Sequence, residues 1–475
     1  MAGASNKKPS VHSSGLPHGD RNELTLLAKK RASDNPSEDR IARYFEQKHK
    51  GNLLYCHDRG VWFRWNGNYW VPDETQLVFD YARTICREVN KDNKNTVGKA
   101  STATAVLKFA QASRVFAVTS QEFDSDPYLL GTPGGTIDLR TGTLRKARRE
   151  DHITKQTTVT PDPEAEAPLW HKFLDEATNG DQGLQRFLAQ MGGYCLTGDT
   201  REHALFFIYG PGGNGKTVFL NTTTNVMGDY AKTSAMDTFT ASRYDRHPTE
   251  LAMLQGARLV SVSETEEGRA WAETRIKQVT GGDKIAARYM RQDFFEYQPQ
   301  FKPLVIGNYK PLLNNVDEAM RRRVNIIPFL HEPPQPDKEL EAKLKAEYPA
   351  ILQWMINGCL DWQDNGLVRP QVVRDATDTY FEDQDLFGQW LEEQCEKGPG
   401  KFETFAGLFK SWRDYAELNG EKPGSSKAFS QTLAKQGFAP DRRWINGKTQ
   451  RVFMGVALLV EADYIHQDRD EEIDF

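Results

Sequence analysis

The run GPGGNGKT, residues 210–217, restricts the fold of this chain more than any other stretch of its sequence. It has the spacing G-x-x-x-x-G-K-T, in which a glycine-rich loop turns backbone N–H groups inward around a phosphate. The preceding run ALFFIY, residues 204–209, is short and apolar and predicts a buried strand, and a helix is predicted after the loop. Because the pattern requires a strand, a loop and a helix in this order, we expect an α/β nucleotide-binding core over residues 204–332.

The side chains of this loop have expected roles. Lys216 is predicted to reach the β- and γ-phosphates of a nucleotide, and Thr217 to place its hydroxyl on Mg²⁺. The N-terminus of the following helix adds a partial positive charge at the same place. We therefore expect ATP and Mg²⁺ as cofactors. The expected nucleotide-binding residues are Gly210, Pro211, Gly212, Gly213, Asn214, Gly215, Lys216, Thr217 and Val218.

Hydrolysis of ATP also needs polar groups at the ends of neighbouring strands, to hold Mg²⁺ and to orient the attacking water. The run ARLVSVSETEEG, residues 257–268, predicts a strand that ends at Glu264 and Glu266. Glu264 is the first acid after this strand and is expected to carry the main role, with Thr217, at the metal. Glu266 is a second candidate, and the alternative interpretation is that it belongs to a solvated acidic cluster. The apolar run before Asn308 predicts a second such strand; its amide is a candidate for orienting water, with turn formation as the alternative.

Three consecutive arginines, Arg321, Arg322 and Arg323, stand directly before the apolar run VNIIPF. A guanidinium supplied by a neighbouring subunit stabilises the charge that develops on a transferring phosphoryl group, which would explain such a cluster. The alternative for each arginine is a surface charge or the partner of a carboxylate. The sequence leaves open which of the three acts.

Composition limits the classes of protein to which the 475-residue chain can belong. It has no apolar run of about 18 residues, so no membrane span is expected. Residues 1–38 lack the apolar core of a secretory signal and are expected to be a disordered lead-in. Five widely spaced cysteines favour reduced thiols in a cytoplasm, such as that of a bacterial host. The net charge of −5 means that any binding to nucleic acid must use local basic patches.

Residues 39–160 read as a mixed α+β region. The run VWFRWNGNYWV, residues 61–71, predicts a hairpin with a two-residue turn at Asn66–Gly67. Its aromatic residues are expected to pack on a small sheet, with a base-stacking platform as the alternative; they are Trp62, Trp65, Tyr69 and Trp70. Asp124 and Asp126 form a D-x-D pair, which we interpret as turn chemistry because no apolar strand precedes it; a metal pair of the polymerase or primase kind is the alternative.

The rest of the chain flanks the expected core. Helical regions are predicted over residues 161–203 and 333–380, the second broken near Pro349. Residues 381–460 carry helical patterns followed by a hairpin at Asn446–Gly447, which predicts a winged-helix-like domain, and residues 461–475 form an acidic tail. The basic residues of this hairpin are candidates for contacts with DNA phosphates, and a solvated hairpin is an equal alternative. They are Arg442, Arg443, Lys448 and Arg451.

Taken together, four stretches in this order resemble a superfamily 3 helicase of the phage/plasmid and poxvirus primase–helicase type. They are FFIYGPGGNGKT, GARLVSVSETEEG, IKQVTGGDKIAARYMRQDFFEYQPQFKPLVIGN and DEAMRRRVNIIPF. Two further runs also resemble this family: FDSDPYLLGTPGGTIDLRTGTL upstream and AILQWMINGCLDWQDNGLVRP downstream. The resemblance covers most of residues 120–370.

This resemblance implies a P-loop, AAA+-like superfamily 3 core in a homo-oligomeric ring, a hexamer, with ATP sites between subunits. It implies DNA unwinding by 3′→5′ translocation on single-stranded DNA at forks, in the replication of a phage, a plasmid or an integrated element. By position it assigns Lys216 and Thr217 to the first motif, Glu264 and Glu266 to the second, Asn308 to the third, and Arg322 and Arg323 to the paired arginines. Arg321 takes a place that an aromatic residue often fills in the family.

The stretch from 280 to 295 matches the family's pore hairpin. The run KIAARYMRQDFFEY alternates like two strands with a turn near Gln292–Asp293. Basic side chains on this hairpin would contact the DNA backbone in a ring pore, and Tyr289 lies among them. The basic residues are Lys284, Arg288 and Arg291.

One departure and three alternatives accompany the resemblance. Longer family members carry a primase domain before this region, but only about 120 residues precede FDSDP here, so primase activity is not expected in this chain, and the primase is either a separate partner protein or absent. The alternatives are a ring ATPase that loads or remodels other proteins, an ATP-switched DNA-binding initiator that does not unwind, and a nucleotidyl transferase built on Asp124 and Asp126.

Overall fold

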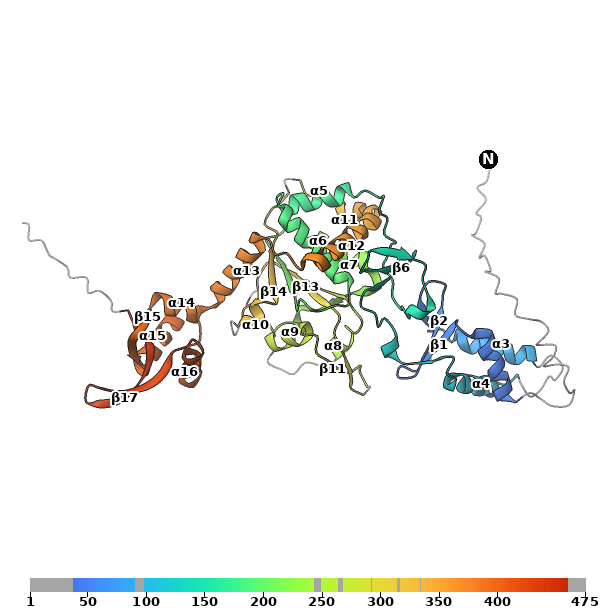
Figure 1. The fold of residues 1–475 in the computed structure, drawn as a ribbon, viewed down its shortest axis with the longest axis horizontal. Coiled ribbons are helices and arrows are strands. Elements are labelled where there is room, and N and C mark those ends of the chain that lie inside the picture. Colours follow the sequence, from blue (N-terminus) through green and yellow to red (C-terminus); the bar gives the residue numbers. More distant parts are fainter. Residues whose placement is uncertain are drawn as a thin grey trace, which may run out of the picture.

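The chain forms a central body with a smaller lobe on either side (Figure 1). In this computed structural model the described residues are 37–89, 98–242, 249–263, 268–291, 293–313, 317–333 and 335–459. The predicted lead-in, except for its last two residues, and the predicted acidic tail lie outside them. None of the described helices combines the length and the apolar character that a membrane crossing requires.

The N-terminal lobe packs three helices against a small sheet, as the mixed character of its sequence predicted. The helices are α2 (Glu38–His49), α3 (Leu77–Val89) and α4 (Ala100–Ala112). The sheet has the order β3-β2-β1-β4, with β1 (Leu53–Cys56), β2 (Val61–Trp65), β3 (Trp70–Pro72) and β4 (Ala117–Val118). Its core includes Ile41, Phe45, Ile85 and Phe116, each at most 2% exposed.

The predicted hairpin at β2 and β3 exists, but the predicted two-residue turn is wrong. Trp65 pairs with Trp70, so the loop has four residues, 66–69. The side-chain oxygen of Asn66 accepts hydrogen bonds from the backbone N–H groups of Asn68 and Tyr69, each at 2.9 Å, and this turn stabilises the longer loop. The packing interpretation holds for Trp62 and Trp70, which are 8% and 2% exposed.

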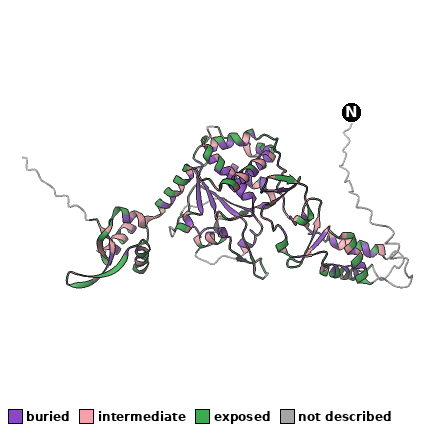
Figure 2. Ribbon diagram, viewed as in Figure 1, coloured by how far each residue is buried: buried purple, intermediate pink, exposed green. Residues whose placement is uncertain are grey.

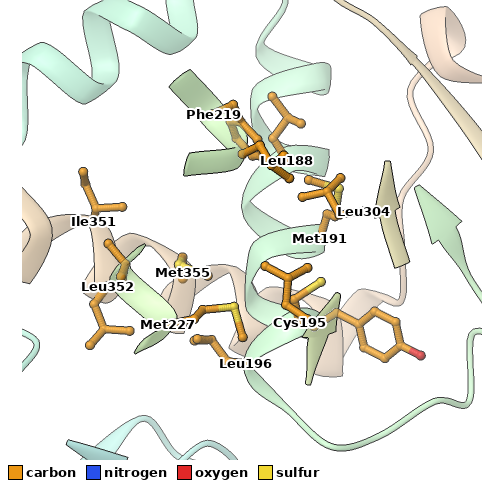
Figure 3. Packing of buried hydrophobic residues seen from close by; sticks show 14 of the residues in the cluster. Leu188, Met191, Cys195, Leu196, Phe219, Met227, Leu304, Ile351, Leu352 and Met355 are labelled. Atoms are coloured by element: carbon orange, nitrogen blue, oxygen red, sulfur yellow. The ribbon is translucent and has the colours of Figure 1, made fainter. Parts of the chain in front are cut away.

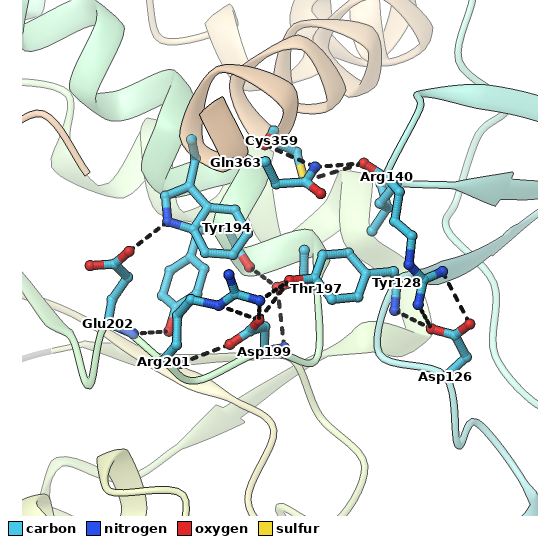
Figure 4. A network of polar contacts seen from close by, with 12 residues as sticks. Asp126, Tyr128, Arg140, Tyr194, Thr197, Asp199, Arg201, Glu202, Cys359 and Gln363 are labelled. Atoms are coloured by element: carbon cyan, nitrogen blue, oxygen red, sulfur yellow. Dashed lines mark hydrogen bonds and ion pairs between the residues drawn. The ribbon is translucent and has the colours of Figure 1, made fainter. Parts of the chain in front are cut away.

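The next segment joins the N-terminal lobe to the central body. It contains β5 (Leu129–Thr132), β6 (Gly135–Asp138), β7 (Thr143–Arg145), α5 (Pro168–Ala177) and α6 (Gln182–Leu196). Buried cations tie this segment to the body: Arg258 donates to the carbonyl oxygens of Leu129 (2.8 Å) and Leu196 (2.7 Å), and Lys302 donates to that of Thr197 (2.5 Å). Figure 4 shows the adjoining network around Tyr128, Asp199 and Arg201.

The two aspartates of the D-x-D pair stabilise loops and face different partners. Asp124 forms an ion pair with Lys155 (2.6 Å) and accepts from the backbone N–H of Thr154 (2.9 Å). Asp126 pairs with Arg140 at 2.8 Å and accepts from the backbone N–H of Tyr128, also at 2.9 Å. Because each carboxylate is occupied by its own cation, the geometry agrees with the turn interpretation.

The central body is built on a five-stranded parallel sheet, so the predicted α/β class is confirmed. The sheet has the order β14-β8-β13-β10-β9. Its strands are β8 (Leu205–Tyr209), β9 (Ala231–Ser234), β10 (Leu259–Ser263), β13 (Lys302–Gly307) and β14 (Val324–Pro328). All neighbours are parallel, so the strands end at one common edge.

Helices bury both faces of this sheet, which is why its strands are continuous apolar runs rather than alternating ones (Figure 2). Phe206 and Ile208 of β8 belong to the hydrophobic cluster to which α6, α7 (Lys216–Met227) and α12 (Tyr348–Asn365) also contribute. Figure 3 shows this cluster from close by, with Leu188 of α6, Phe219 of α7 and Leu352 of α12 among the labelled residues. Leu205 and Phe207 face the opposite cluster, to which α9 (Glu273–Thr280) and α13 (Gln371–Gln384) contribute.

The predicted helix break near Pro349 is confirmed, because α11 (Leu340–Leu344) and a short 3₁₀ turn end where α12 begins. Helices α6 and α12 then cross at two glycines. A Cβ on Gly193 would lie 2.0 Å from the backbone nitrogen of Cys359, and one on Gly358 would lie 2.0 Å from the carbonyl oxygen of Ala189. Any larger side chain at either position would force the two helix backbones apart.

The C-terminal lobe has the order helix, strand, helix, helix, strand, strand. Its elements are α14 (Leu386–Glu393), β15 (Cys395–Thr404), α15 (Phe405–Leu418), α16 (Ser426–Lys435), β16 (Ala439–Ile445) and β17 (Lys448–Leu458), and the sheet order is β15-β17-β16. The predicted two-residue turn is confirmed: Ile445 pairs with Lys448, and Asn446 and Gly447 have φ of 48° and 78°. Strand β15 was not predicted, because Gly398, Pro399 and Gly400 interrupt its pattern.

Candidate nucleotide site and nucleic-acid surfaces

The glycine loop lies between the end of β8 and the start of α7, at the edge where the parallel strands end. Gly213 and Gly215 have φ of 78° and 83°, a left-handed conformation that glycine adopts without strain. Gly215 is the N-cap of α7 and has no side chain to cap it. No side chain at Gly215 therefore caps the first backbone N–H groups of α7. An anion site at a helix N-terminus requires uncapped N–H groups of this kind.

Lys216 lies inside this loop, 7% exposed. Its Nζ donates to the carbonyl oxygens of Gly210 (2.7 Å) and Pro211 (2.6 Å) and to Oδ1 of Asn214 (2.9 Å). Burial lowers the pKa of the Lys216 ammonium. The three acceptors of the ammonium belong to the loop itself, and Thr217 is exposed beside it, so these side chains fit a nucleotide phosphate and its Mg²⁺.

The loop is held from behind by the segment that follows β14. The Asn214 side-chain amide donates to the carbonyl oxygen of Phe329. A Cβ on Gly210 would lie 1.8 Å from that same oxygen, whereas a Cβ on Gly212 would meet nothing within 4 Å. Glycine at 210 is therefore required by close backbone approach, and glycine at 212 is not.

This contrast gives a stability prediction. We expect Gly210→Ala to lower the free energy of unfolding by about 1–3 kcal/mol or more, because the methyl group must displace backbone rather than a flexible side chain. Gly212→Ala is the matched control and is expected to change it by less than about 0.5 kcal/mol. Denaturant unfolding without nucleotide measures both. Equal stability of the two variants would contradict the described contact with Phe329.

Two other strands end beside the loop. Gly307 pairs with Tyr209, so Asn308 follows at the same edge as the loop and is exposed to solvent. The next strand, β10, ends at Ser263, which pairs with Ile306. Glu264 and Glu266, which were predicted at the end of that strand, lie outside the described residues.

A cavity of about 590 Å³ runs along α7 next to the loop. Val218, Thr222 and Asn225 line one side of it, and the segment 337–348, including Lys338 and Tyr348, lines the other. Val218 is the one predicted nucleotide-binding residue in this lining, and residues 210–217 are not part of it.

The three arginines lie at the opposite edge of the sheet, before the start of β14. Strand β14 has five residues, or about 16 Å, and that length separates them from the edge that carries the loop. None of the three arginines is therefore placed to reach the glycine loop of its own chain.

The three arginine side chains also differ from one another. Arg321 pairs with Asp378 (3.1 Å) and lies over Phe381. Arg323 is 7% exposed, donates to Oγ1 of Thr280 (3.1 Å) and to the carbonyl oxygen of Ala319 (2.8 Å), and has a pKa that burial lowers. Arg322 is exposed. Arg321 thus forms a surface ion pair, Arg323 makes buried hydrogen bonds, and Arg322 is exposed to solvent.

The predicted hairpin between residues 280 and 295 is confirmed. Strands β11 (Ile285–Ala287) and β12 (Phe295–Tyr297) pair antiparallel, and Gln292 of the expected turn lies outside the described residues. Arg291 is exposed in the segment that connects the two strands, and Lys284 is exposed at the opposite, open end of the hairpin.

The other two predicted hairpin residues are partly used by the fold. The guanidinium of Arg288 lies over the ring of Phe294 at 4.8 Å. Tyr289 stacks on Phe295 and donates its hydroxyl to the carbonyl oxygen of Ala252. The sequence analysis overlooked that Met290 and Phe294 are 71% and 62% exposed.

The basic residues predicted in the C-terminal lobe lie on the β16–β17 hairpin. Arg442 and Lys448 are exposed, and Arg443 lies over Phe402 at 4.4 Å and 3.9 Å from a carboxylate oxygen of Asp441. Trp444, which follows these two arginines and was not predicted as a site residue, is 74% exposed.

Two family models match this chain. Residues 38–179 match a family described as "D5 N terminal like", and residues 208–323 match a family of unknown function, DUF5906. A protein named "Putative helicase 022R" from Frog virus 3 is 27% identical over 381 residues, which cover 62% of this chain and 39% of that protein. One named "Putative helicase L207/L206" from Acanthamoeba polyphaga mimivirus is 24% identical over 327 residues, covering 63% and 34%.

The chain is a relative of phage and viral primase–helicase-like proteins. It spans between about a third and two fifths of the length of these two viral relatives. Both of these viral proteins are named as putative helicases.

The fold of this primase–helicase-like chain also has solved counterparts. The apo structure of the NrS-1 C-terminal region superposes with a TM-score of 0.52 at 10% identity, covering 89% of this chain and all of the other. A further crystal form of that region gives a TM-score of 0.51. At this identity the likeness concerns the fold alone.

Proposed function

We propose that the chain is an ATP-dependent DNA helicase that works as a ring, a hexamer, and translocates 3′→5′ on single-stranded DNA. The proposal rests above all on the phosphate loop at the edge of a parallel sheet, in a chain whose viral relatives are named helicases. The core would be a superfamily 3, AAA+-like P-loop fold, and the C-terminal lobe a winged helix. Replication of a phage, a plasmid or an integrated element in a host cytoplasm is the process we propose for it, with a separate primase as a partner.

ATP with Mg²⁺, when bound, supplies a phosphoanhydride whose hydrolysis drives movement. Lys216 would leave its loop carbonyls and donate to the β- and γ-phosphates, and Thr217 and Glu264 would hold Mg²⁺. Asn308, with Glu266 as a second candidate, would orient the attacking water from the same sheet edge.

The subunit contact follows from where the arginines lie. Because they stand at the other edge of the sheet, Arg322 would act on the site of a neighbouring subunit. Arg323 would fix the segment that carries Arg322, through its contacts with Thr280 and Ala319.

Contact with DNA would be made by the two hairpins. Arg288, Tyr289 and Arg291 lie in the segment that connects β11 and β12, where cations and an aromatic ring suit a single-stranded backbone and its bases, and Lys284 would add a phosphate contact at the other end of this hairpin. Arg442, Arg443 and Lys448 would hold phosphates on the C-terminal hairpin.

The decisive experiment is strand displacement on forked duplexes that carry either a 3′ or a 5′ tail, with ATP and at stated salt. We expect unwinding of the 3′-tailed substrate only. Unwinding of the 5′-tailed substrate alone would contradict the proposed direction, and absence of unwinding on both would contradict the helicase proposal.

A second candidate is a ring ATPase that loads or remodels other proteins. The exposure of Met290 and Phe294 at the β11–β12 tip favours it, because apolar side chains in a pore suit a polypeptide. This candidate predicts ATP hydrolysis without strand displacement on either tail, so the same experiment separates the two.

Nucleotidyl transfer by the D-x-D pair is tested with Asp126→Asn. Because Asp126 pairs with the half-exposed Arg140 in a loop, we expect rates of ATP hydrolysis and unwinding within about twofold of wild type, and a loss of less than about 1 kcal/mol in the free energy of unfolding. Both rates and a primer-synthesis assay are measured on the same preparations. Primer synthesis by the wild type that Asp126→Asn abolishes would overturn the turn interpretation.

A further inference from the structure

Trp444 is set apart from the other aromatic residues of the C-terminal lobe. The core of this lobe is rich in aromatic rings, with Trp390 0% exposed and Phe429 3% exposed. Trp444 is 74% exposed instead, two residues before the turn that begins at Asn446. Its ring is therefore open to contact with another molecule.

Strand register shows which side of the hairpin carries this ring. Arg442 lies on the same face as Trp444 because side chains alternate along a strand, and Arg451 pairs directly with Arg442 across the ladder. Arg451 in turn donates to Oγ of Ser430 on α16 at 2.5 Å. Trp444 therefore lies on the face of the hairpin that is turned toward α16.

The charge around this ring selects the chemistry of its partner. Residues 439–451 hold four basic side chains and one acidic one, a formal charge of +3 in a chain whose net charge is −5. Two like charges that lie directly opposite each other, such as Arg442 and Arg451, destabilise the pairing of two strands. The guanidinium of Arg451 lies over the ring of Phe405 at 4.8 Å, and the exposed Arg442 lies on the same face of the hairpin as Trp444.

We propose that Trp444 is a base-stacking residue for single-stranded DNA, with Arg442, which lies on the same face of the hairpin, holding the phosphate beside the stacked base. An exposed ring beside a cation suits a single strand, whose unpaired bases offer their faces, whereas bases inside a duplex already stack on one another. This inference rests on the proposed function and extends it: the strand would contact the C-terminal hairpin as well as the β11–β12 tip.

The test is equilibrium binding of a labelled single-stranded oligonucleotide to the full chain without ATP, followed by fluorescence anisotropy. We expect Trp444→Ala to weaken binding at least about fivefold and Trp444→Phe, which keeps a ring, to stay within about twofold of wild type. Arg442→Gln should lower the salt dependence of binding by about one charge, whereas Trp444→Ala should leave that dependence unchanged. Leu418→Ala, 85% exposed in the same lobe, is the matched control and should bind like wild type.

An abasic oligonucleotide of the same length separates stacking from other causes. Wild type and Trp444→Ala should bind it equally, because no base is present to stack. A Trp444→Ala defect of the same size on both oligonucleotides would overturn the inference, and so would wild-type affinity of Trp444→Ala for the normal strand. No binding by the wild type at all would instead contradict the proposed function.

Discussion

Lys216→Ala is expected to lower the rate of ATP hydrolysis at least about a hundredfold and to abolish strand displacement. Loss of one preorganised donor at a developing charge costs about 10²–10³ in rate in other enzymes, and Lys216 is the buried ammonium of the loop. The measurement is DNA-stimulated phosphate release beside unwinding of the 3′-tailed fork.

The control for this prediction is Lys172→Ala on α5, whose side chain is 72% exposed and pairs with Glu176 one turn on. It should keep both activities. Binding of Lys216→Ala to single-stranded DNA without ATP should equal that of wild type, because the loop and both hairpins are separate. If Lys216→Ala hydrolyses ATP at the wild-type rate, the proposed nucleotide site is wrong. If the wild-type protein binds origin DNA but does not unwind a fork, an ATP-switched initiator is favoured.

Arg322→Ala is expected to lower ATP hydrolysis by about 10³-fold or more if its guanidinium completes a neighbour's site, since arginine fingers are worth 10³–10⁵. Its neighbours are controls of two kinds. Arg321→Ala removes a surface pair and should change the rate by less than about twofold. Arg323→Ala leaves a buried gap and should lower the free energy of unfolding by about 1–3 kcal/mol.

Mixing the two inactive variants shows whether the arginine acts between subunits. A ring that alternates Lys216→Ala and Arg322→Ala chains contains some sites with both an intact loop and an intact arginine. Part of the wild-type rate should therefore return on mixing. If Arg322→Ala alone is inactive and no mixture recovers activity, Arg322 does not act across a subunit boundary.

Local patterns gave most of the elements of the core in advance. The glycine loop, its strand and its helix follow from residues 204–217, because each depends on neighbours a few positions away. The turn at Asn446–Gly447 and the helix start at Pro349 were equally predictable, since glycine and proline restrict their own backbone. The parallel sheet was implied by strands that alternate with helices.

Features that depend on distant residues were not predictable. Strand β15 forms in spite of glycine and proline because β17 supplies its ladder. The edge of the sheet on which Arg322 lies follows from the direction of β14. Arg321 forms an ion pair because Asp378 lies beside it, and Arg323 makes a buried hydrogen bond because Thr280 lies beside it. Trp444 is exposed because the core of the C-terminal lobe is filled by other aromatic residues, and no local sequence pattern shows which ring stays outside that core.

The crossing of α6 and α12 at Gly193 and Gly358 has a consequence for how this sequence can evolve. The two helices precede and follow the strands of the parallel sheet in the chain, yet their backbones touch, so they close a ring of chain around that sheet. Insertions within the enclosed stretch must leave its two ends where they are. Gene fusions and truncations therefore have room outside α6 and α12, and the smallest unit that can fold around this sheet is longer than the sheet itself.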